Sequence, residues 1–202
     1  MNDLRKFFYF DRKSMGILFY FPFIVWAVFA IVLMFNDFEE ARFFQGLQYI
    51  FLPMYCFWPV FRYSELLEDG AWETLINLYK KHAIIDLMRY YTVMNLLMIL
   101  LFFFRNLADV PWHLILFALL LGLNFLLIGA LLILLVKNVE MAFGFIAIYT
   151  VVEYVTNGEL IPWPHFFYKF NSMADGNEAF VYAANILSIV IASLLIRRKL
   201  TE

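Results

Sequence analysis

Residues 114–136, "LILFALLLGLNFLLIGALLILLV", form a continuous apolar stretch in which Asn124 is the one polar side chain. A helix needs roughly 20 apolar residues to cross the hydrocarbon layer of a bilayer. This stretch is long enough, so it predicts a membrane-spanning helix. The rest of the chain therefore has to be judged with lipid, and not water, as its solvent.

Comparable stretches occur on both sides of this one. Of the 202 residues, 64% are hydrophobic and only 16% are charged, which is far more apolar than a soluble domain of this length. No repeat or flexible linker divides the chain, so we expect a single transmembrane domain over residues 1–202. The sequence predicts an all-α membrane protein with six transmembrane helices: Met15–Phe35, Phe43–Phe61, Ala83–Phe104, Leu114–Val136, Val139–Tyr154 and Ala179–Ile196.

The distribution of cations predicts the orientation of these helices. With the amino terminus inside, all but three of the 15 Lys and Arg residues fall on the cytoplasmic side, the exceptions being Arg42, Arg105 and Lys169. This asymmetry follows the positive-inside rule. It indicates a multi-pass protein of the cell membrane, of the bacterial plasma membrane type, with both termini cytoplasmic. The net charge of −2 gives no indication of a nucleic-acid partner.

Two segments outside the predicted spans are unusually aromatic. Residues 1–14 mix Phe and Tyr with Arg and Lys, which favours an amphipathic helix in the headgroup plane over an unstructured basic anchor. The outer connection 157–178 contains Pro162 and Pro164 on either side of Trp163, followed by "HFFYKF". This composition is too apolar for a free loop, so we expect a re-entrant or interfacial element before the sixth span.

Polar residues within the spans are the candidates for specific contacts. Asn95, Asn124 and Asn185 are expected either to bond neighbouring helices or to contact a substrate. Asp86 and Arg89 lie one turn apart and are expected to pair near the membrane surface.

The candidate residues for a substrate pathway are Trp58 and Glu153. Pro53 and Pro59 bend the second span around Trp58, either to line a pathway or for packing. Glu153 lies about one turn from the outer end of the fifth span, where a carboxylate either faces a polar cavity or partner or lies at the membrane interface. The single cysteine, Cys56, is assigned to packing.

Catalytic chemistry finds no support in the sequence. The three histidines lie on different predicted sides, and none of them has the spacing of a helical metal site. No set of residues supplies a nucleophile with an acid and a base, and there is no Gly-Lys phosphate-binding loop. We therefore expect no catalytic residue, metal or cofactor in this chain. A polytopic membrane enzyme and a non-transporting membrane scaffold are nevertheless two functions that the sequence leaves open.

A charged segment interrupts the apolar pattern at residues 64–82. Its stretch 65–82, "ELLEDGAWETLINLYKKH", places Trp72, Leu75, Ile76 and Tyr79 on one face of a helix that Asp69-Gly70 could start. The segment also carries four acids, Glu65, Glu68, Asp69 and Glu73. Because the anionic inner leaflet repels carboxylates, the segment is better suited to docking on a protein than to lying on lipid. It predicts a short amphipathic cytoplasmic helix.

Residues 68–75, "EDGAWETL", resemble the stretch that follows the second span in permeases of type 2 ABC exporters. There an acidic residue is followed by Gly, Thr, a hydrophobic residue, Glu and Leu; Ala71 departs from the usual Thr. The order of elements is similar as well: an amphipathic lead-in helix, six spans, a coupling helix between the second and third spans, and an outer re-entrant element.

The resemblance implies a half-transporter that pairs with a second permease copy, identical or related, and with two copies of a separate ABC ATPase subunit. ATP and Mg²⁺ would bind only to that ATPase. The first, second and fifth spans would surround the pathway of a hydrophobic or amphipathic substrate, for example an antimicrobial peptide. The residues implied to couple the chain to the ATPase are Glu65, Glu68, Asp69, Gly70, Trp72, Glu73, Leu75, Ile76 and Tyr79.

Overall fold

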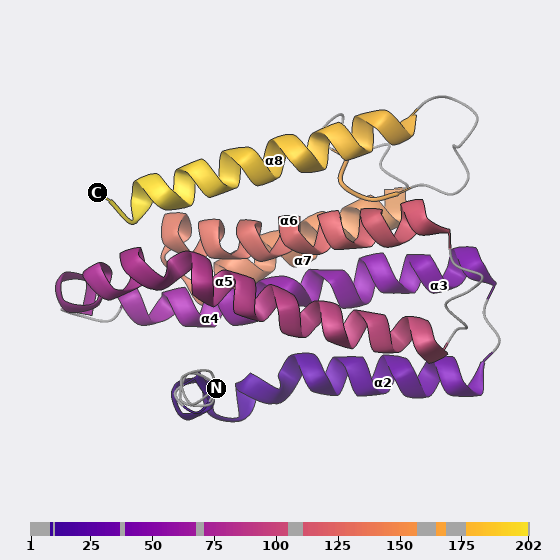
Figure 1. Ribbon diagram of the computed structural model, residues 1–202, viewed down its shortest axis with the longest axis horizontal. Coiled ribbons are helices and arrows are strands. Elements are labelled where there is room, and N and C mark those ends of the chain that lie inside the picture. Colours follow the sequence, from indigo (N-terminus) through magenta and orange to yellow (C-terminus); the bar gives the residue numbers. More distant parts are fainter. Residues whose placement is uncertain are drawn as a thin grey trace.

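The computed structural model describes residues 9, 11–36, 39–67, 71–104, 111–156, 165–168 and 177–201, with the backbone alone at 71–82 and 177–178. Its helices run side by side along one axis (Figure 1), and the described residues contain no strand. The predicted all-α fold is therefore confirmed for this part of the chain. The α-helices are α2 (Phe21–Phe35), α3 (Glu40–Gly46), α4 (Phe57–Ser64), α5 (Ala71–Phe104), α6 (Trp112–Val136), α7 (Val139–Thr156) and α8 (Asn177–Lys199).

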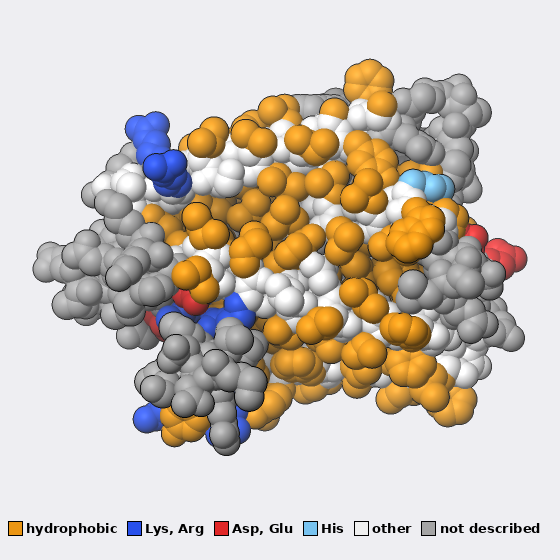
Figure 2. All heavy atoms as spheres, in the orientation of Figure 1, with side chains coloured by type: hydrophobic (Ala, Val, Ile, Leu, Met, Phe, Trp, Pro, Cys, Tyr) orange, Lys and Arg blue, Asp and Glu red, His pale blue; other side chains and the backbone are white. Residues whose placement is uncertain are grey.

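Among the described residues, five helical stretches are long and apolar enough to cross a membrane, namely Asp11–Phe35, Ala83–Phe104, Trp112–Val136, Val139–Thr156 and Ala179–Lys199. They correspond to five of the six predicted spans. Hydrophobic side chains cover the middle of the face shown in Figure 2, whereas Lys and Arg gather at the end where both termini lie. The chain is thus a membrane-embedded helical protein.

The predicted second span, Phe43–Phe61, is not among these five, and its helix changes type along its length. Between α3 and α4 lie a π-helical turn, η2 (Leu47–Phe51), and a 3₁₀ segment, η3 (Leu52–Cys56). Pro53 lies near the start of η3 and Pro59 within α4, and neither residue can donate the backbone hydrogen bond that a regular α-helix requires. The predicted bend thus takes the form of a change in helix type.

This segment lies at the centre of the bundle, against α6. Leu47, Phe51, Leu52, Tyr55 and Val60 are all fully buried. Two glycines of α6, one on each side of its midpoint, allow the close approach. An added Cβ at the first, Gly122, would lie 2.7 Å from the Tyr55 ring, and one at Gly129 would lie 2.5 Å from Cys56 Cβ. Cys56 is buried at this contact, in agreement with the packing role assigned to it.

We expect Gly129→Ala to lower the free energy of unfolding by about 1–3 kcal/mol, the usual range for overpacking a tight contact. The added methyl group would also lie 2.8 Å from Cys56 Cα, so relief requires a backbone shift. The measurement is denaturant unfolding in mixed micelles, followed by circular dichroism.

The matched control for this substitution is Gly144→Ala. An added Cβ at Gly144 in α7 meets no atom within 4 Å, so this variant should be neutral or up to about 1 kcal/mol more stable through its better helix propensity. Equal stability of the two variants would show that α6 can move away from η3 without cost.

The chain enters the first span through a turn at Gly16. Residues 11–15 are helical, and the 3₁₀ segment η1 (Gly16–Tyr20) leads from them into α2. Gly16 has a φ of 58°, in the left-handed region that suits glycine. Figure 1 shows the first described turn end-on beside the N label, so it crosses the bundle axis. Residues 1–8 of the predicted interfacial helix lie outside the described residues.

Candidate functional site

In the predicted re-entrant segment 157–178 the structure describes residues 165–168 and the backbone of 177–178, which begins α8. Residues 165–168 lie inside the helix bundle. Phe167 is fully buried and Tyr168 is 3% exposed. The Phe167 ring stacks on Tyr49, with 4.4 Å between ring centroids, and on Tyr149, at 5.8 Å. The segment is therefore packed against the second predicted span and α7.

Polar side chains from the helices satisfy the backbone of this segment. The Gln48 amide donates to the Tyr168 carbonyl and accepts from the Tyr168 N–H, both at 2.9 Å. Asn185 donates to the Phe166 carbonyl at 3.0 Å, and the Phe166 N–H donates to the Tyr149 hydroxyl at 3.2 Å. Irregular backbone away from water needs such partners. We refer to these four bonds as the 165–168 clamp.

The three asparagines of the predicted spans all bond to other helices. Asn124 Nδ2 donates to Asn185 Oδ1 at 2.8 Å, and Ser188 donates to Asn124 Oδ1 at the same distance. Asn95 accepts from the Tyr55 hydroxyl, also at 2.8 Å. These contacts support the first of the two expected roles, bonding between helices.

Glu153 lies on α7 beside the clamp and is fully buried. Its Oε1 lies 3.0 Å from Nδ1 of His165, whose side chain is 24% exposed. Its Oε2 is buried and has no hydrogen-bond partner among the described residues. Of the two positions expected for this carboxylate, the structure favours the inward-facing one.

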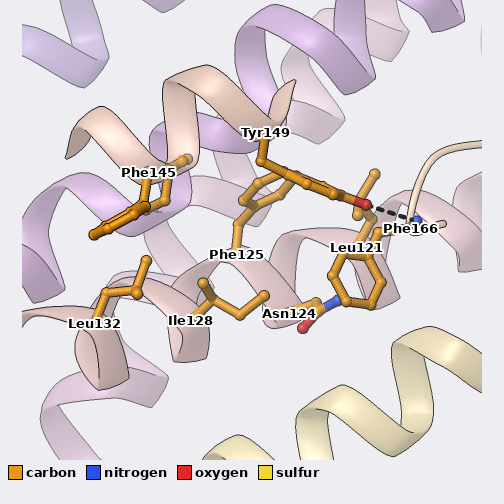
Figure 3. Close-up of a pocket in the computed structure, with 9 residues that line it drawn as sticks. Leu121, Asn124, Phe125, Ile128, Leu132, Phe145, Tyr149 and Phe166 are labelled. Carbon is orange, nitrogen blue, oxygen red and sulfur yellow. Dashed lines mark hydrogen bonds between the residues drawn. The ribbon is translucent and has the colours of Figure 1, made fainter. Parts of the chain in front are cut away.

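An apolar cavity of about 140 Å³ opens between α6 and α7, beside the clamp (Figure 3). Tyr149 and Phe166, which are joined by one of the clamp bonds, line one part of it. The remaining lining residues are Leu121, Asn124, Phe125, Ile128, Leu132, Phe145 and Ile146. This space can take an aliphatic or aromatic group and provides almost no polar contact.

Trp58, the other candidate pathway residue, is 1% exposed and makes specific core contacts. Its indole N–H donates to the Phe19 carbonyl at 3.0 Å, and its ring stacks on Phe19 at 5.7 Å and packs against Tyr90 at 5.5 Å. It lines neither this cavity nor the neighbouring one between α6 and α8. Trp58→Ala would therefore remove core packing, at a cost of about 3–5 kcal/mol.

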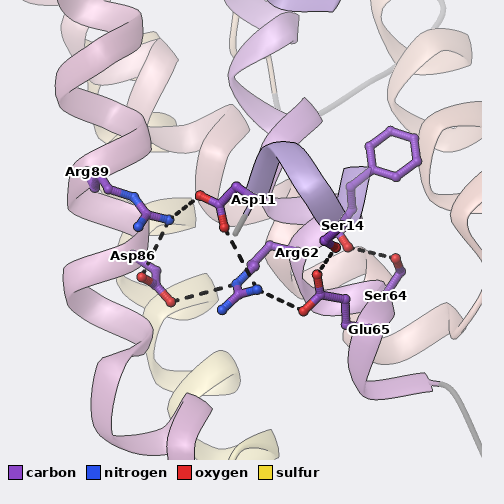
Figure 4. Close-up of polar contacts among 8 residues, drawn as sticks. Asp11, Ser14, Arg62, Ser64, Glu65, Asp86 and Arg89 are labelled. Atoms are coloured by element: carbon purple, nitrogen blue, oxygen red, sulfur yellow. Dashed lines mark hydrogen bonds and ion pairs between the residues drawn. The ribbon is translucent and has the colours of Figure 1, made fainter. Parts of the chain in front are cut away.

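Five charged side chains form a second polar group at the end of the bundle that holds the termini (Figure 4). Arg89 Nη2 lies 2.6 Å from Asp11 and 3.6 Å from Asp86. Arg62 lies 2.8 Å from Glu65 and also contacts Asp11, at 3.8 Å, and Asp86, at 4.0 Å. We call these residues the Asp11 cluster. The predicted Asp86–Arg89 pair is confirmed, and the cluster joins it to α4 and to residue 11.

Three of the five residues in the Asp11 cluster are buried even though they are charged. Asp11 is fully buried, Asp86 is 4% exposed and Arg89 is 8% exposed. Ser14 adds a further link by donating to Glu65. Burying charged groups costs free energy unless they pair closely, and here each cation serves more than one acid. The cluster therefore fixes the turn before the first span against α4 and α5.

The predicted coupling residues are located only in part. Glu65 belongs to the Asp11 cluster, and Glu68, Asp69 and Gly70 lie outside the described residues. The other five, Trp72, Glu73, Leu75, Ile76 and Tyr79, lie in the first turns of α5.

We expected a separate short helix before a third span at Ala83, but α5 is helical without a break from Ala71 to Phe104. Residues 72–104 contain no Gly or Pro, so no helix-breaking residue separates the first turns of α5 from the rest of the helix.

Several residues of these two polar groups were not singled out from the sequence. Gln48 lies within a predicted span and, as an amide surrounded by apolar residues, could have been ranked with the three asparagines. Asp11 is an acid in a basic segment, but its partner Arg89 is 78 residues away along the chain.

Neither a family model, nor a curated protein, nor a solved structure matches this chain.

Proposed function

We propose that the chain is the permease subunit of an ATP-driven type 2 ABC exporter. In this proposal the segment from Glu40 to Ser64 supplies the second of six crossings, since Figure 1 shows α3 and α4 running the length of the bundle. Residues 157–178 form the outer re-entrant element. Both termini lie in the cytoplasm of a bacterial cell, and the substrate is hydrophobic or amphipathic.

The observation that supports the proposal best is the connection between α5 and its neighbours. The family-like residues 68–75 reach into the first turns of α5. Further along the same helix, Asp86 and Arg89 enter the Asp11 cluster, which contacts α4 and the turn before the first span. A displacement of the start of α5 would therefore be passed to the first and second spans, two of the three that surround the pathway in such exporters.

This mechanism assigns the energy source to partners. Two copies of an ABC ATPase subunit, which bind ATP and Mg²⁺, would hold the coupling helix in a groove, and a second permease copy, identical or related, would complete the pathway. An aromatic anchor and charges that set the register are what such a docking element needs. Trp72 and Glu73 are the residues assigned to these two tasks.

Affinity purification of the tagged chain from its own membranes tests the proposal. We expect an ATPase subunit to co-purify in a one-to-one ratio and to hydrolyse ATP, whereas the chain purified alone should do neither. Turnover of a substrate by the chain alone would favour the membrane enzyme. Recovery of the chain without any ATPase, even after cross-linking in intact cells, would favour the scaffold.

A further inference from the structure

The Glu153 carboxylate is buried with only half of its acceptor capacity in use. Oε1 faces His165, whereas Oε2 is buried and has no hydrogen-bond partner among the described residues. An unmatched acceptor in an apolar environment is costly, and an ionisable residue inside a membrane protein marks a functional site by default. Glu153 Oε2 can therefore accept a hydrogen bond from a donor that the described part of the chain does not provide.

Aromatic side chains lie near this carboxylate. Tyr149 lies one turn before Glu153 on α7, and Tyr154 follows Glu153 in the chain. Tyr154 packs edge-on against Tyr49 at 5.2 Å, and the Phe167 ring lies between Tyr49 and Tyr149. Aromatic faces attract cations, and together with a carboxylate they suit an ammonium or guanidinium group.

Apolar space lies one turn of α7 away from the carboxylate. Tyr149, four residues before Glu153 on α7, lines the 140 Å³ cavity between α6 and α7. Phe166, which follows His165 in the chain, lines the same cavity (Figure 3). A ligand with a cationic head and an apolar tail would therefore find a carboxylate for its head and apolar space for its tail within one turn of α7.

His165 is suited to leave the carboxylate without disturbing the fold. Its side chain is partly exposed, and the clamp bonds that hold its segment are made by Phe166 and Tyr168. The imidazole can turn away while the clamp stays intact.

We propose that Glu153 is the binding site for the cationic head of an amphipathic amine or guanidine whose apolar part fills the cavity between α6 and α7. His165 occupies the carboxylate when the ligand is absent. The identification of this ligand class with the exported substrate rests on the proposed function, whereas the binding site itself does not.

The test is calorimetric titration of the purified chain in lipid nanodiscs with hexylammonium, compared with hexanoate, which has the same chain length and the opposite charge. We expect hexylammonium to bind, hexanoate not to bind, and Glu153→Gln to weaken hexylammonium binding at least tenfold because a charge-assisted hydrogen bond is lost. The matched control is Glu140→Gln, an exposed carboxylate on the same helix, which should bind normally.

Two further variants separate the parts of the site. His165→Ala should tighten hexylammonium binding severalfold because the internal competitor is gone. Ile128→Phe narrows the cavity, so it should weaken hexylammonium binding and leave methylammonium binding unchanged. These two variants decide the question even if Glu153→Gln does not fold.

Equal binding by Glu153→Gln and the wild type, or equal binding of hexanoate and hexylammonium, would overturn the proposal. The titration contains no ATPase, so it remains valid whichever partner the chain has. If hexylammonium binds through Glu153 but the chain recruits no ATPase, the proposed binding site would stand and its proposed role in ATP-driven export would not.

Discussion

Replacing Arg89 with Met is expected to lower the free energy of unfolding by about 3–5 kcal/mol, the usual cost of removing one partner of a buried ion pair. Arg89 is the closest cation to Asp11, at 2.6 Å, and it also pairs with Asp86. Both acids are buried, so neither can turn to water when the guanidinium is lost. The measurement is denaturant unfolding in mixed micelles, followed by circular dichroism.

Two comparison variants make this result specific. Lys13→Met removes an exposed cation from the same end of the chain and should change stability by less than about 0.5 kcal/mol. Adding Asp11→Asn to Arg89→Met should recover part of the loss, because it removes a buried charge that then has only the longer contact with Arg62, at 3.8 Å. A loss no greater for Arg89→Met than for Lys13→Met would show that the cluster is hydrated and contributes little.

The second large effect is expected for Trp72→Ala, which should abolish recovery of the ATPase together with export. If Trp72 fills a pocket in the ATPase groove, its truncation removes an aromatic hot spot worth about 2 kcal/mol or more. Glu73→Lys should cause similar harm by placing like charges together. The measurements are co-purification of the ATPase and export in the same cells, at equal levels of the chain in the membrane.

Lys80→Ala is the control for these variants. Lys80 lies on the same stretch of α5 but off the face that carries Trp72 and Tyr79, so its loss should have little effect on ATPase recovery. Normal ATPase recovery and export by both Trp72→Ala and Glu73→Lys would mean that residues 65–82 only rest on the membrane. The main support for a transporter would then be lost.

Hydrophobicity and helix length were sufficient to predict most of this fold. Apolar stretches of about 20 residues correspond closely to the five helices that can cross a membrane, because lipid requires long helices with internally bonded backbone. The change from α- to π- and 3₁₀-helix near Pro53 could not be predicted. Proline shows that a backbone hydrogen bond is missing, but it does not show which helix type replaces the α-helix. The close contacts of this segment with Gly122 and Gly129 form only in the folded bundle.

The candidate site was harder to predict because it depends on distant pairings. The sequence indicated that Glu153 was out of place in a span, but not that His165 would face it or that an apolar cavity would adjoin it. Local spacing revealed Asp86 and Arg89, whereas Arg62 and Asp11 join them only through tertiary packing. Sequence patterns give the depth of a side chain better than the direction in which it points.

The bond between Gln48 and Tyr168 has a consequence for the biogenesis of the protein, because the two residues are 120 positions apart in the chain. A ribosome that adds about 5–20 residues per second needs roughly 6–24 seconds to make the intervening segment. During this time the Gln48 amide is already inserted and lacks its final partner. The second predicted span must therefore be held by the insertion machinery or by temporary contacts until the carboxyl-terminal helices arrive.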